Sequence, residues 1–323
     1  MDTPKTLLEA IRHFSDPDVC LDYMVKLRWP EGKVTCPTCA STDVRFISTR
    51  RLWECKAKHA KRQFSVKVGT IFEDSPIGLD KWLAAIWMIA NAKNGVSSYE
   101  IARGLGVTQK TAWFMLHRIR LAMEVETDTK FGGRVEVDET FIGGQARFMH
   151  KSRREKVIKG ATGMVGKVAV MGLLARHGKD GHSTIRARMI ANVQKQTLQP
   201  HVRQNIEAGA ELITDAWRGY AGLDKEYIHN VINHAEAYVK GHVHTNGVEN
   251  FWSLLKRAIR GTYVSVEPFH LFRYLDEESF RYNTRGYKDS GRFRQVAGQV
   301  VGKRLTYAQL TGAPSPLPNT TPA

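Results

Sequence analysis

Three cysteines and a histidine, spaced as two pairs, constrain the fold of this 323-residue chain more than any other feature. Cys36 and Cys39 form a C-x2-C pair, and Cys55 and His59 form a C-x3-H pair after a gap of 15 residues. Thiolates and imidazole are ligands that Zn²⁺ prefers, and two short chelating turns place four of them around one ion. Strand-forming residues fill the gap between the pairs. We therefore expect a Cys3His zinc ribbon, in which a fully coordinated zinc ion is structural.

Two other interpretations of these cysteines stay open. A redox-active C-x-x-C motif requires a βαβ unit, and no such pattern surrounds Cys36. Alternatively, the first pair consists of free cysteines in a turn, and Cys55 is a buried core residue. Cys20 lies outside the zinc spacing and is expected in a hydrophobic core.

Charge indicates the kind of partner that this chain binds. It has 48 lysines and arginines against 32 aspartates and glutamates, a net charge of +16. Such a surplus favours polyanions, since each neutralised phosphate releases counterions. A membrane is the weaker candidate, because the longest apolar run, Trp82–Ala90, is far below the ~20 residues that span a bilayer. Because the sequence has few cysteines and no recognisable secretory signal, we expect a cytoplasmic, nucleoid-associated protein. We expect it to bind nucleic acid and no membrane.

A helix-turn-helix unit is predicted after the ribbon. Residues 79–93 have the period of an amphipathic helix. Ser97 and Glu100 form the pattern of a capping box for a short helix, and Thr108 caps a longer helix after a glycine turn. The second helix of such a unit lies in a major groove. A helical hairpin that only packs is the alternative. The expected DNA-contacting residues of the second helix are Gln109, Lys110, Trp113 and Arg118.

An α/β domain is predicted from Gly132 onward, because short β-branched runs alternate there with longer helical ones. Alternation in the first strand places Glu136 and Asp138 on one face and valines on the other. Trp217, Phe251 and Trp252 are interpreted as core aromatics. The expected strands are 135–141, 167–174, 182–190, 211–215 and 227–234, with helices at 194–208 and 246–260.

Three carboxylates of this domain are candidate metal ligands: Asp138 in the first strand, Asp215 at the end of the fourth, and Glu249 in the last helix. Helical periodicity puts an apolar stripe on one side of that helix, and Asn246 and Lys256 near Glu249 on the other. Carboxylate oxygens suit Mg²⁺ or Mn²⁺, and two such ions promote in-line displacement at a phosphodiester. Alternatively, the aspartates are turn residues, and Asn246 is an N-cap that pairs with Glu249.

Several segments together resemble one family of proteins. They include the Cys-Pro-Thr-Cys pair, Val137–Gly144 (VDETFIGG), His244–Arg257 (HTNGVENFWSLLKR) and Arg281–Asn283 (RYN). In residue identity and in order along the chain, these motifs are similar to those of bacterial insertion-sequence DDE transposases of the ISXO type, which carry a zinc ribbon in front of the DDE domain. The separation of 34 residues between Asp215 and Glu249 also resembles the spacing of DDE catalytic cores.

The resemblance implies an RNase H-like catalytic domain, with a mixed sheet flanked by helices, preceded by the zinc ribbon and the helix-turn-helix. It implies that Asp138, Asp215 and Glu249 bind the catalytic metal, and that Lys256 contacts DNA near the scissile phosphate. Some members of the group have asparagine at the third acidic position. Asn246 or Asn250 is therefore the alternative to Glu249.

The function implied is that of a transposase that binds insertion-sequence ends and catalyses metal-dependent strand cleavage and strand transfer into target DNA. Its partners are double-stranded element ends and target DNA, and it acts as a homodimer or higher assembly. Two other classes remain open, a DNA-binding regulator without catalysis and a metal-dependent nuclease. The basic stretch 147–159 is expected to follow the DNA backbone, whereas His234, His242 and His244 receive no role. Further expected DNA contacts are Arg153, Arg154 and Arg257.

The expected domains are a helical segment at 1–30, the zinc ribbon at 31–78, the helix-turn-helix at 79–130, the catalytic domain at 131–290, and a C-terminal extension with a disordered tail at 291–323.

Overall fold

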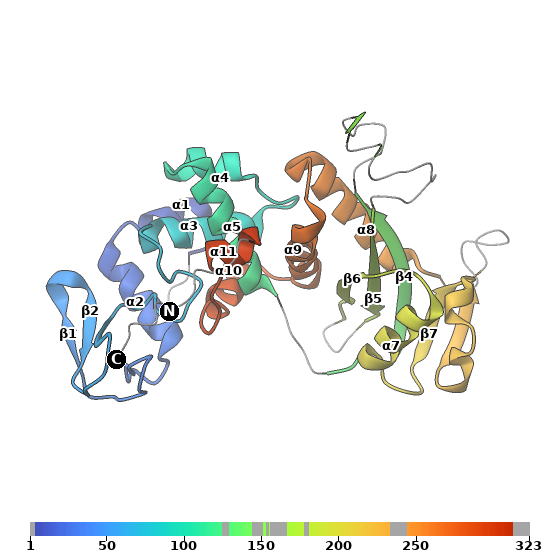
Figure 1. The fold of residues 1–323 in the computed structure, drawn as a ribbon, viewed down its shortest axis with the longest axis horizontal. Coiled ribbons are helices and arrows are strands. Elements are labelled where there is room, and N and C mark those ends of the chain that lie inside the picture. The colour runs from blue at the N-terminus through green and yellow to red at the C-terminus, as the bar shows by residue number, and fades with distance from the viewer. Residues whose placement is uncertain are drawn as a thin grey trace. The chain divides into compact units, whose positions relative to one another are not determined.

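The computed structural model describes residues 4–124, 129–143, 167–177, 181–232 and 244–312, together with 151, 152 and 155. The chain divides into two compact units (Figure 1). The first contains Met1–Met123 and Tyr287–Ala323, and the second contains Glu124–Gly286. No helix in the described part of the chain has both the length and the apolar character needed to cross a bilayer.

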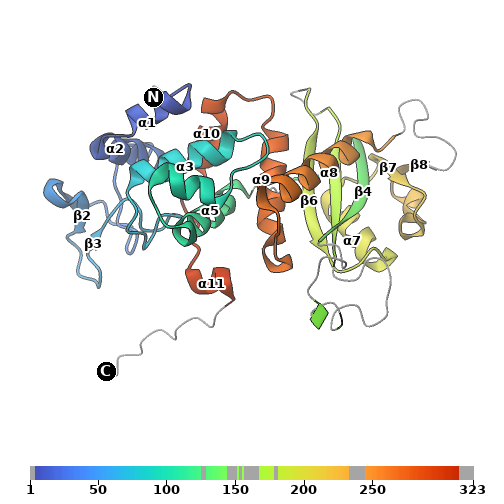
Figure 2. The same cartoon turned by 90° about the horizontal axis from the view of Figure 1, so that it is seen from above.

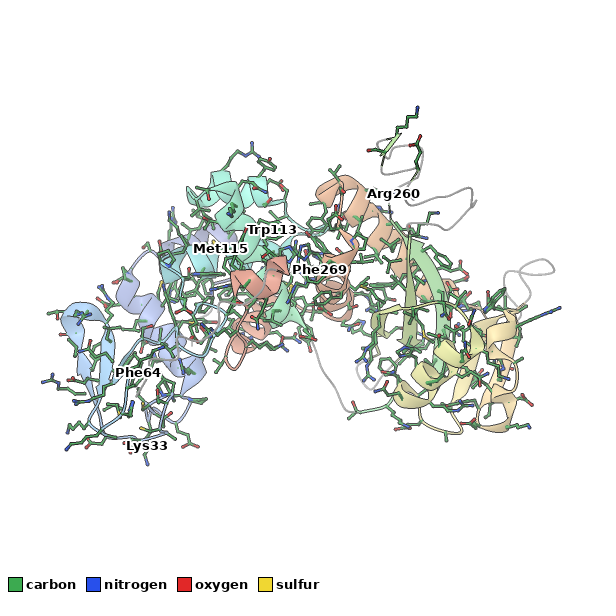
Figure 3. All side chains as sticks on the ribbon, viewed as in Figure 1. Lys33, Phe64, Trp113, Met115, Arg260 and Phe269 are labelled. Carbon is green, nitrogen blue, oxygen red and sulfur yellow. The ribbon has the colours of Figure 1, made fainter. Side chains whose placement is uncertain are left out.

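The first unit begins with two short helices and a small antiparallel sheet. Helices α1 (Leu7–His13) and α2 (Pro17–Arg28) precede strands β1 (Val44–Ile47), β2 (Leu52–Cys55) and β3 (Gln63–Phe64), which pair in that order. Trp53 of β2 stacks on Phe64, labelled in Figure 3, and meets Trp29 edge-on. These aromatic contacts form a core for a sheet that is too small to build one from aliphatic residues.

Helices α3 (Leu79–Asn91), α4 (Ser98–Leu105) and α5 (Gln109–Met123) follow in the same unit. The predicted capping box of α4 is confirmed, since Ser97 and Glu100 each accept the other's backbone N–H. Gly106 ends α4 in the left-handed conformation, at φ 60°, which a residue without Cβ adopts at little cost. Thr108 Oγ1 then accepts the backbone N–H of Thr111 at the start of α5.

The C-terminal segment belongs to this first unit. Helix α10 (Asp289–Gly298) packs on α3, and its buried Phe293 contacts the rings of Phe14, Tyr23 and Trp87. The last helix, α11 (Tyr307–Thr311), places the ring of Tyr307 edge-on against Phe114 of α5. The sequence pattern predicts neither helix. Residues 313–323, which include most of the predicted disordered tail, lie outside the described residues.

The second unit is built on a mixed five-stranded sheet in the order β6-β5-β4-β7-β8. Strands β4, β5 and β6 pair antiparallel, whereas β4, β7 and β8 pair parallel. The predicted strands are all present, with ends that differ by a few residues. Their bounds are β4 Arg134–Ile142, β5 Val168–Ala175, β6 Thr184–Ile190, β7 Glu211–Asp215 and β8 Ile228–Ile232.

Helices cover both faces of this sheet (Figures 1 and 2). Helix α7 (Lys195–Asn205) packs on one face through Leu198 and Val202. Helices α8 (Asn246–Ala258) and α9 (Leu271–Asn283) pack on the other, and one turn of π-helix (Ile259–Tyr263) extends α8. The side chain of Asn283 fastens α9 to β6 through hydrogen bonds to both backbone groups of Ile185. The resulting α/β sandwich is the mixed, helix-flanked sheet that the sequence predicts.

Candidate active site and zinc site

The predicted zinc ligands converge in the first unit. Ligand atoms of Cys36, Cys39, Cys55 and His59 all lie within 4.8 Å of one another. Cys36 Sγ is 3.5 Å from His59 Nε2, and Cys39 Sγ is 3.6 Å from Cys55 Sγ. Zn–S bonds of about 2.3 Å and Zn–N bonds of about 2.1 Å put tetrahedral ligand atoms roughly 3.6–3.8 Å apart. The geometry therefore fits one tetrahedral Zn²⁺.

Two further features prepare these ligands for zinc. His59 Nδ1 donates to the carbonyl of Ala60, at 2.6 Å, so Nε2 is the ring nitrogen that faces Cys36. Burial opposes ionisation of Cys36, but the backbone N–H groups of Thr38 and Cys39 and the nearby thiols outweigh it and lower the pKa of Cys36 to about 6. A thiolate and a neutral imidazole are the forms that bind zinc.

Two of the three candidate catalytic carboxylates lie side by side at the centre of the second unit's sheet. Strands β4 and β7 are parallel neighbours, and their register pairs Glu136 with Ile213. Asp138 and Asp215 each come two residues later, so they lie at the same level on adjacent strands. The indole N–H of Trp252 donates to Asp138 Oδ2 at 2.9 Å, and Asp215 Oδ1 accepts the backbone N–H of Trp217 at 3.0 Å.

Helix α8 contributes the third carboxylate. Glu249 is an exposed residue of its first turn and accepts a hydrogen bond from Thr245 Oγ1 at 2.7 Å. Lys256 is a half-buried residue further along α8. Burial lowers the pKa of Lys256, as do Arg260 and Lys167, whereas the negative charge of Asp138 raises it. Lys256 therefore lies near enough to Asp138 for their charges to interact.

The carboxylates interact electrostatically. Burial raises the pKa of Asp138 to about 6, and the charges of Asp215 and Glu249 push it the same way, although N–H donors from Trp252 and Glu139 oppose the rise. All three predicted ligands therefore face a common region. In the described part of the chain, the cysteine–histidine cluster is the one group of at least three metal-ligand side chains whose ligand atoms all lie within 4.8 Å of one another.

A buried ion pair holds the start of α8 against β4. Glu136 is 1% exposed and accepts both the guanidinium of Arg176, at 2.5 Å, and the backbone N–H of Val248, at 2.9 Å. Arg176 also donates to the ring nitrogen and the carbonyl of His244. A Cβ on Gly247 would lie 2.8 Å from the Glu136 carboxylate, so only glycine permits this approach. The sequence places Glu136 on the face of Asp138, but it gives no signal for the partner Arg176.

Glu139 follows Asp138 in β4 and carries a further carboxylate. Glu139 accepts a hydrogen bond from the buried hydroxyl of Tyr220. Burial raises the pKa of Glu139 to about 8, reinforced by the charges of Asp138 and Asp215 and opposed by the Tyr220 hydroxyl. Glu139 is therefore mostly protonated at neutral pH in the metal-free protein. The sequence alone does not distinguish its role from that of the adjacent Asp138.

The residues predicted to contact DNA from α5 separate into two groups. Gln109 hydrogen-bonds to Ser98, Lys110 is exposed with its ammonium 4.9 Å from the centre of the Tyr307 ring, and Trp113 is half-exposed (Figure 3). In contrast, Arg118 is 5% exposed and donates to the backbone carbonyls of Ile71, Glu73 and Leu305. Arg118 packs the first unit together, so its prediction as a DNA contact was wrong.

Two other expectations need correction. Phe251 and Trp252 are buried core aromatics, as predicted, but Trp217 is 49% exposed. Asn246 is not the N-cap of α8, because Thr245 occupies that position and Asn246 is the first helical residue. Arg257 is exposed on α8, as are Asn246 and Asn250.

Some predicted residues lie outside the described ranges. They are Arg153 and Arg154, most of the basic stretch 147–159, His234 and His242.

Comparison with known proteins identifies related sequences for both units. The model of a family described as the ISXO2-like transposase domain matches residues 130–283, and that of a transposase zinc-ribbon domain matches residues 15–60. An uncharacterized protein in transposable element ISH50 of Halobacterium salinarum is 26% identical over 256 residues, which cover 76% of this chain and 84% of the relative. An uncharacterized transposase-like protein of Haemophilus influenzae is 33% identical over 101 residues, 31% of this chain and 81% of the relative.

Proposed function

Because this chain belongs to the ISXO-type family of DDE transposases that carry an N-terminal zinc ribbon, we propose that it binds the ends of an insertion sequence, cleaves DNA strands there and joins them to target DNA. The observation that carries this proposal is the placement of Asp138 and Asp215 at the same level on adjacent parallel strands, with the helix of Glu249 hydrogen-bonded to Asp138 through Trp252. Two adjacent strands and a helix contribute these carboxylates, and Lys256 lies on their side of α8. We interpret this mixed sheet with its acidic centre as an RNase H-like fold.

Asp138, Asp215 and Glu249 would hold Mg²⁺ or Mn²⁺, since carboxylate oxygens are the ligands that these hard cations prefer. Two such ions, shared among three carboxylates, are the arrangement that promotes in-line displacement at a phosphodiester. When bound, the ions would activate the attacking oxygen and neutralise charge on the leaving oxygen. Glu249 is the third ligand in this proposal, and the exposed side chains of Asn246 and Asn250 are the alternatives.

The protein's own groups have separable tasks in this proposal. Trp252 orients the Asp138 carboxylate through its indole N–H. Lys256 would hold a phosphate oxygen of the strand that is cut, because it is a cation on the same side of α8 as Glu249. The pair of Glu136 and Arg176 keeps the first turn of α8, and with it Glu249, in register with β4.

DNA binding is assigned mainly to the first unit. We interpret α4, the Gly106 turn and α5 as a helix-turn-helix, with Gln109, Lys110 and Trp113 near the groove-facing end of α5. Arg257 would contact the DNA backbone beside the catalytic site, and Arg153 and Arg154 remain predictions for the same role. Both element ends must be handled together, so we propose a homodimer or a higher assembly on DNA.

The test is a Mg²⁺-dependent cleavage-and-joining assay on DNA from the regions that flank the gene. Wild type is compared with Asp215→Asn and with Asp224→Asn, which alters an exposed aspartate of the same unit. We expect strand transfer with wild type and Asp224→Asn, and none with Asp215→Asn. Sequence-specific binding without cleavage in all three proteins would instead identify a regulator. Cleavage that ignores end sequences and never joins strands would identify a nuclease.

A further inference from the structure

Trp217 is an exposed aromatic residue beside a candidate catalytic carboxylate. It comes two residues after Asp215, and 49% of its surface is open to solvent. Tryptophan has a larger apolar face than most side chains, so an exposed one beside a candidate reaction site offers a surface on which a ligand can stack. The core of the second unit is complete without this ring, since Tyr220, Leu223 and their neighbours fill the adjacent cluster.

The Trp217 ring is nevertheless held in place. Its indole N–H donates to the carbonyl of Val193 at 2.8 Å, and its backbone N–H donates to Asp215 Oδ1 at 3.0 Å. A Cβ at position 219 would lie 2.8 Å from Cδ1 and 2.9 Å from Nε1 of the ring, so glycine at this position allows the ring to pack against the chain. A ring that is already fixed loses little conformational entropy when a ligand stacks on it.

The surface around Trp217 is polar and cationic. The next residue, Arg218, is exposed. On the other side, Val193 leads into the start of α7, which bears an open depression. An aromatic ring flanked by cations fits a nucleobase with its phosphates better than it fits an apolar protein surface. The residues that line this depression are Gln194, Lys195, Gln196, Gln199, Pro200 and Arg203.

We propose that Trp217 stacks on an unpaired nucleobase of the DNA strand next to the phosphodiester held at Asp215, and that Arg218 binds a phosphate of the same strand. This inference rests on the proposed function. Bringing a base out of the duplex costs free energy, and stacking on an aromatic ring offsets part of that cost. The hydrogen bond between Asp215 and the Trp217 backbone couples the position of the base to that of the carboxylate.

The first comparison is between Trp217→Ala, Trp217→Phe and the control Phe269→Ala, which removes another ring of the same unit that is 58% exposed. Phe269 is labelled in Figure 3. Loss of one base–aromatic stack is expected to slow cleavage by about 5- to 150-fold (roughly 1–3 kcal/mol) in Trp217→Ala. Trp217→Phe keeps a stacking ring and should lose less, and Phe269→Ala should cleave like wild type. Equal rates for wild type and Trp217→Ala would overturn the proposal.

The second comparison separates stacking from a general structural defect. Single abasic nucleotides are placed in turn on either side of the cleavage position, and each DNA is cleaved by wild type and by Trp217→Ala. If Trp217 stacks on a particular base, removing that base slows wild type as much as the mutation does, and it adds nothing in the mutant. The proposal would be overturned if, at every position, the abasic nucleotide slowed Trp217→Ala by the same factor as it slows wild type. The effect of the mutation would then be structural.

Binding of the same DNAs in Ca²⁺, measured by fluorescence anisotropy, distinguishes failure of this inference from failure of the proposed function. If the wild type binds the ends but does not cleave them in Mg²⁺ or Mn²⁺, the proposed activity is wrong. In that case the same set of abasic DNAs is compared by their dissociation constants. Trp217 is a stacking residue only if one abasic position abolishes the difference in affinity between wild type and Trp217→Ala.

Discussion

The zinc site and the acidic site show two ways in which a chain brings metal ligands together. The zinc ligands Cys36 to His59 come from one short stretch and close to within 4.8 Å of one another. The carboxylates come from β4, β7 and α8, and only the packing of the whole second unit brings them near each other. We therefore expect zinc to contribute to the folding of its own ribbon, and we expect the hydrophobic core of the second unit to support the acidic site whether or not metal is bound there.

The largest effect is expected from loss of zinc. Cys55→Ser removes one ligand, and structural zinc sites contribute about 10 kcal/mol or more of folding free energy at neutral pH. We expect the variant to lose its single zinc ion, as measured by elemental analysis. Its ribbon should become sensitive to protease, and the near-UV signal of Trp29 and Trp53 should be lost, while the second unit stays protected.

Cys20→Ser is the matched control, since Cys20 is a buried cysteine outside the cluster. It should keep one zinc ion per chain. By contrast, dialysis into a buffer that lacks Mg²⁺ but contains no chelator should unfold neither unit. If Cys55→Ser retained its zinc and its native protease pattern, the ribbon would not depend on the metal.

The next effect concerns the ion pair that supports the acidic site. Glu136→Ala leaves the Arg176 guanidinium buried without its carboxylate and removes the acceptor of the Val248 N–H. Breaking one partner of a buried pair costs about 3–5 kcal/mol. We expect a loss of this size in urea unfolding, together with faster hydrogen exchange in the first turn of α8.

Two variants sharpen this measurement. Glu136→Gln keeps the shape and an acceptor oxygen, so its loss should be smaller. Glu226→Ala breaks the exposed pair with Arg203, in which the side chains are 40% and 43% exposed, and should cost much less than Glu136→Ala because solvent screens the two charges. The positioning role fails if Glu136→Ala is no more destabilising than Glu226→Ala.

The contrast between the sites also explains what could be predicted from the sequence. The zinc ligands are close in the chain, so their spacing alone predicts their geometry. Strand periodicity placed Asp138 beside Glu136, but the partners Arg176 and Trp252 come from other elements and follow only from the packing. Likewise, the cationic sequence of α5 suggested a DNA-binding face, although its periodicity could not reveal that the C-terminal segment buries Arg118.

A third prediction tests the C-terminal segment, whose role in the first unit the sequence did not indicate. Phe293→Ala removes a fully buried ring that contacts Phe14, Tyr23 and Trp87. The expected loss is about 3 kcal/mol, since the cavity adds to the lost transfer free energy. Phe269→Ala, at an exposed position, should change stability by less than about 0.5 kcal/mol. Equal stability of the two variants would show that α10 is dispensable for the unit.

The smallest effect is a gain in stability. In the folded, metal-free protein the pKa of Asp138 is about 6, compared with 3.8 for an ordinary aspartate. Folding therefore favours the protonated form, and the stability that this group contributes is complete below about pH 4 and is lost as the pH rises through 6. The difference corresponds to at most about 3 kcal/mol at pH 8. Asparagine carries no charge and can still accept the Trp252 N–H, so Asp138→Asn should avoid this loss.

Thermal unfolding without divalent metal is therefore expected to occur about 2–8 °C higher for Asp138→Asn than for wild type at pH 8, and at nearly the same temperature at pH 4. Added Mg²⁺ should raise the midpoint of wild type but not that of Asp138→Asn, because the variant lacks one metal ligand. Asp224→Asn should behave like wild type throughout. A lower midpoint for Asp138→Asn at pH 8 would mean that its carboxylate stabilises the metal-free fold. In that case the acidic site would contribute to the folding of its own unit, as the zinc ligands do, and the contrast between the two sites would not hold.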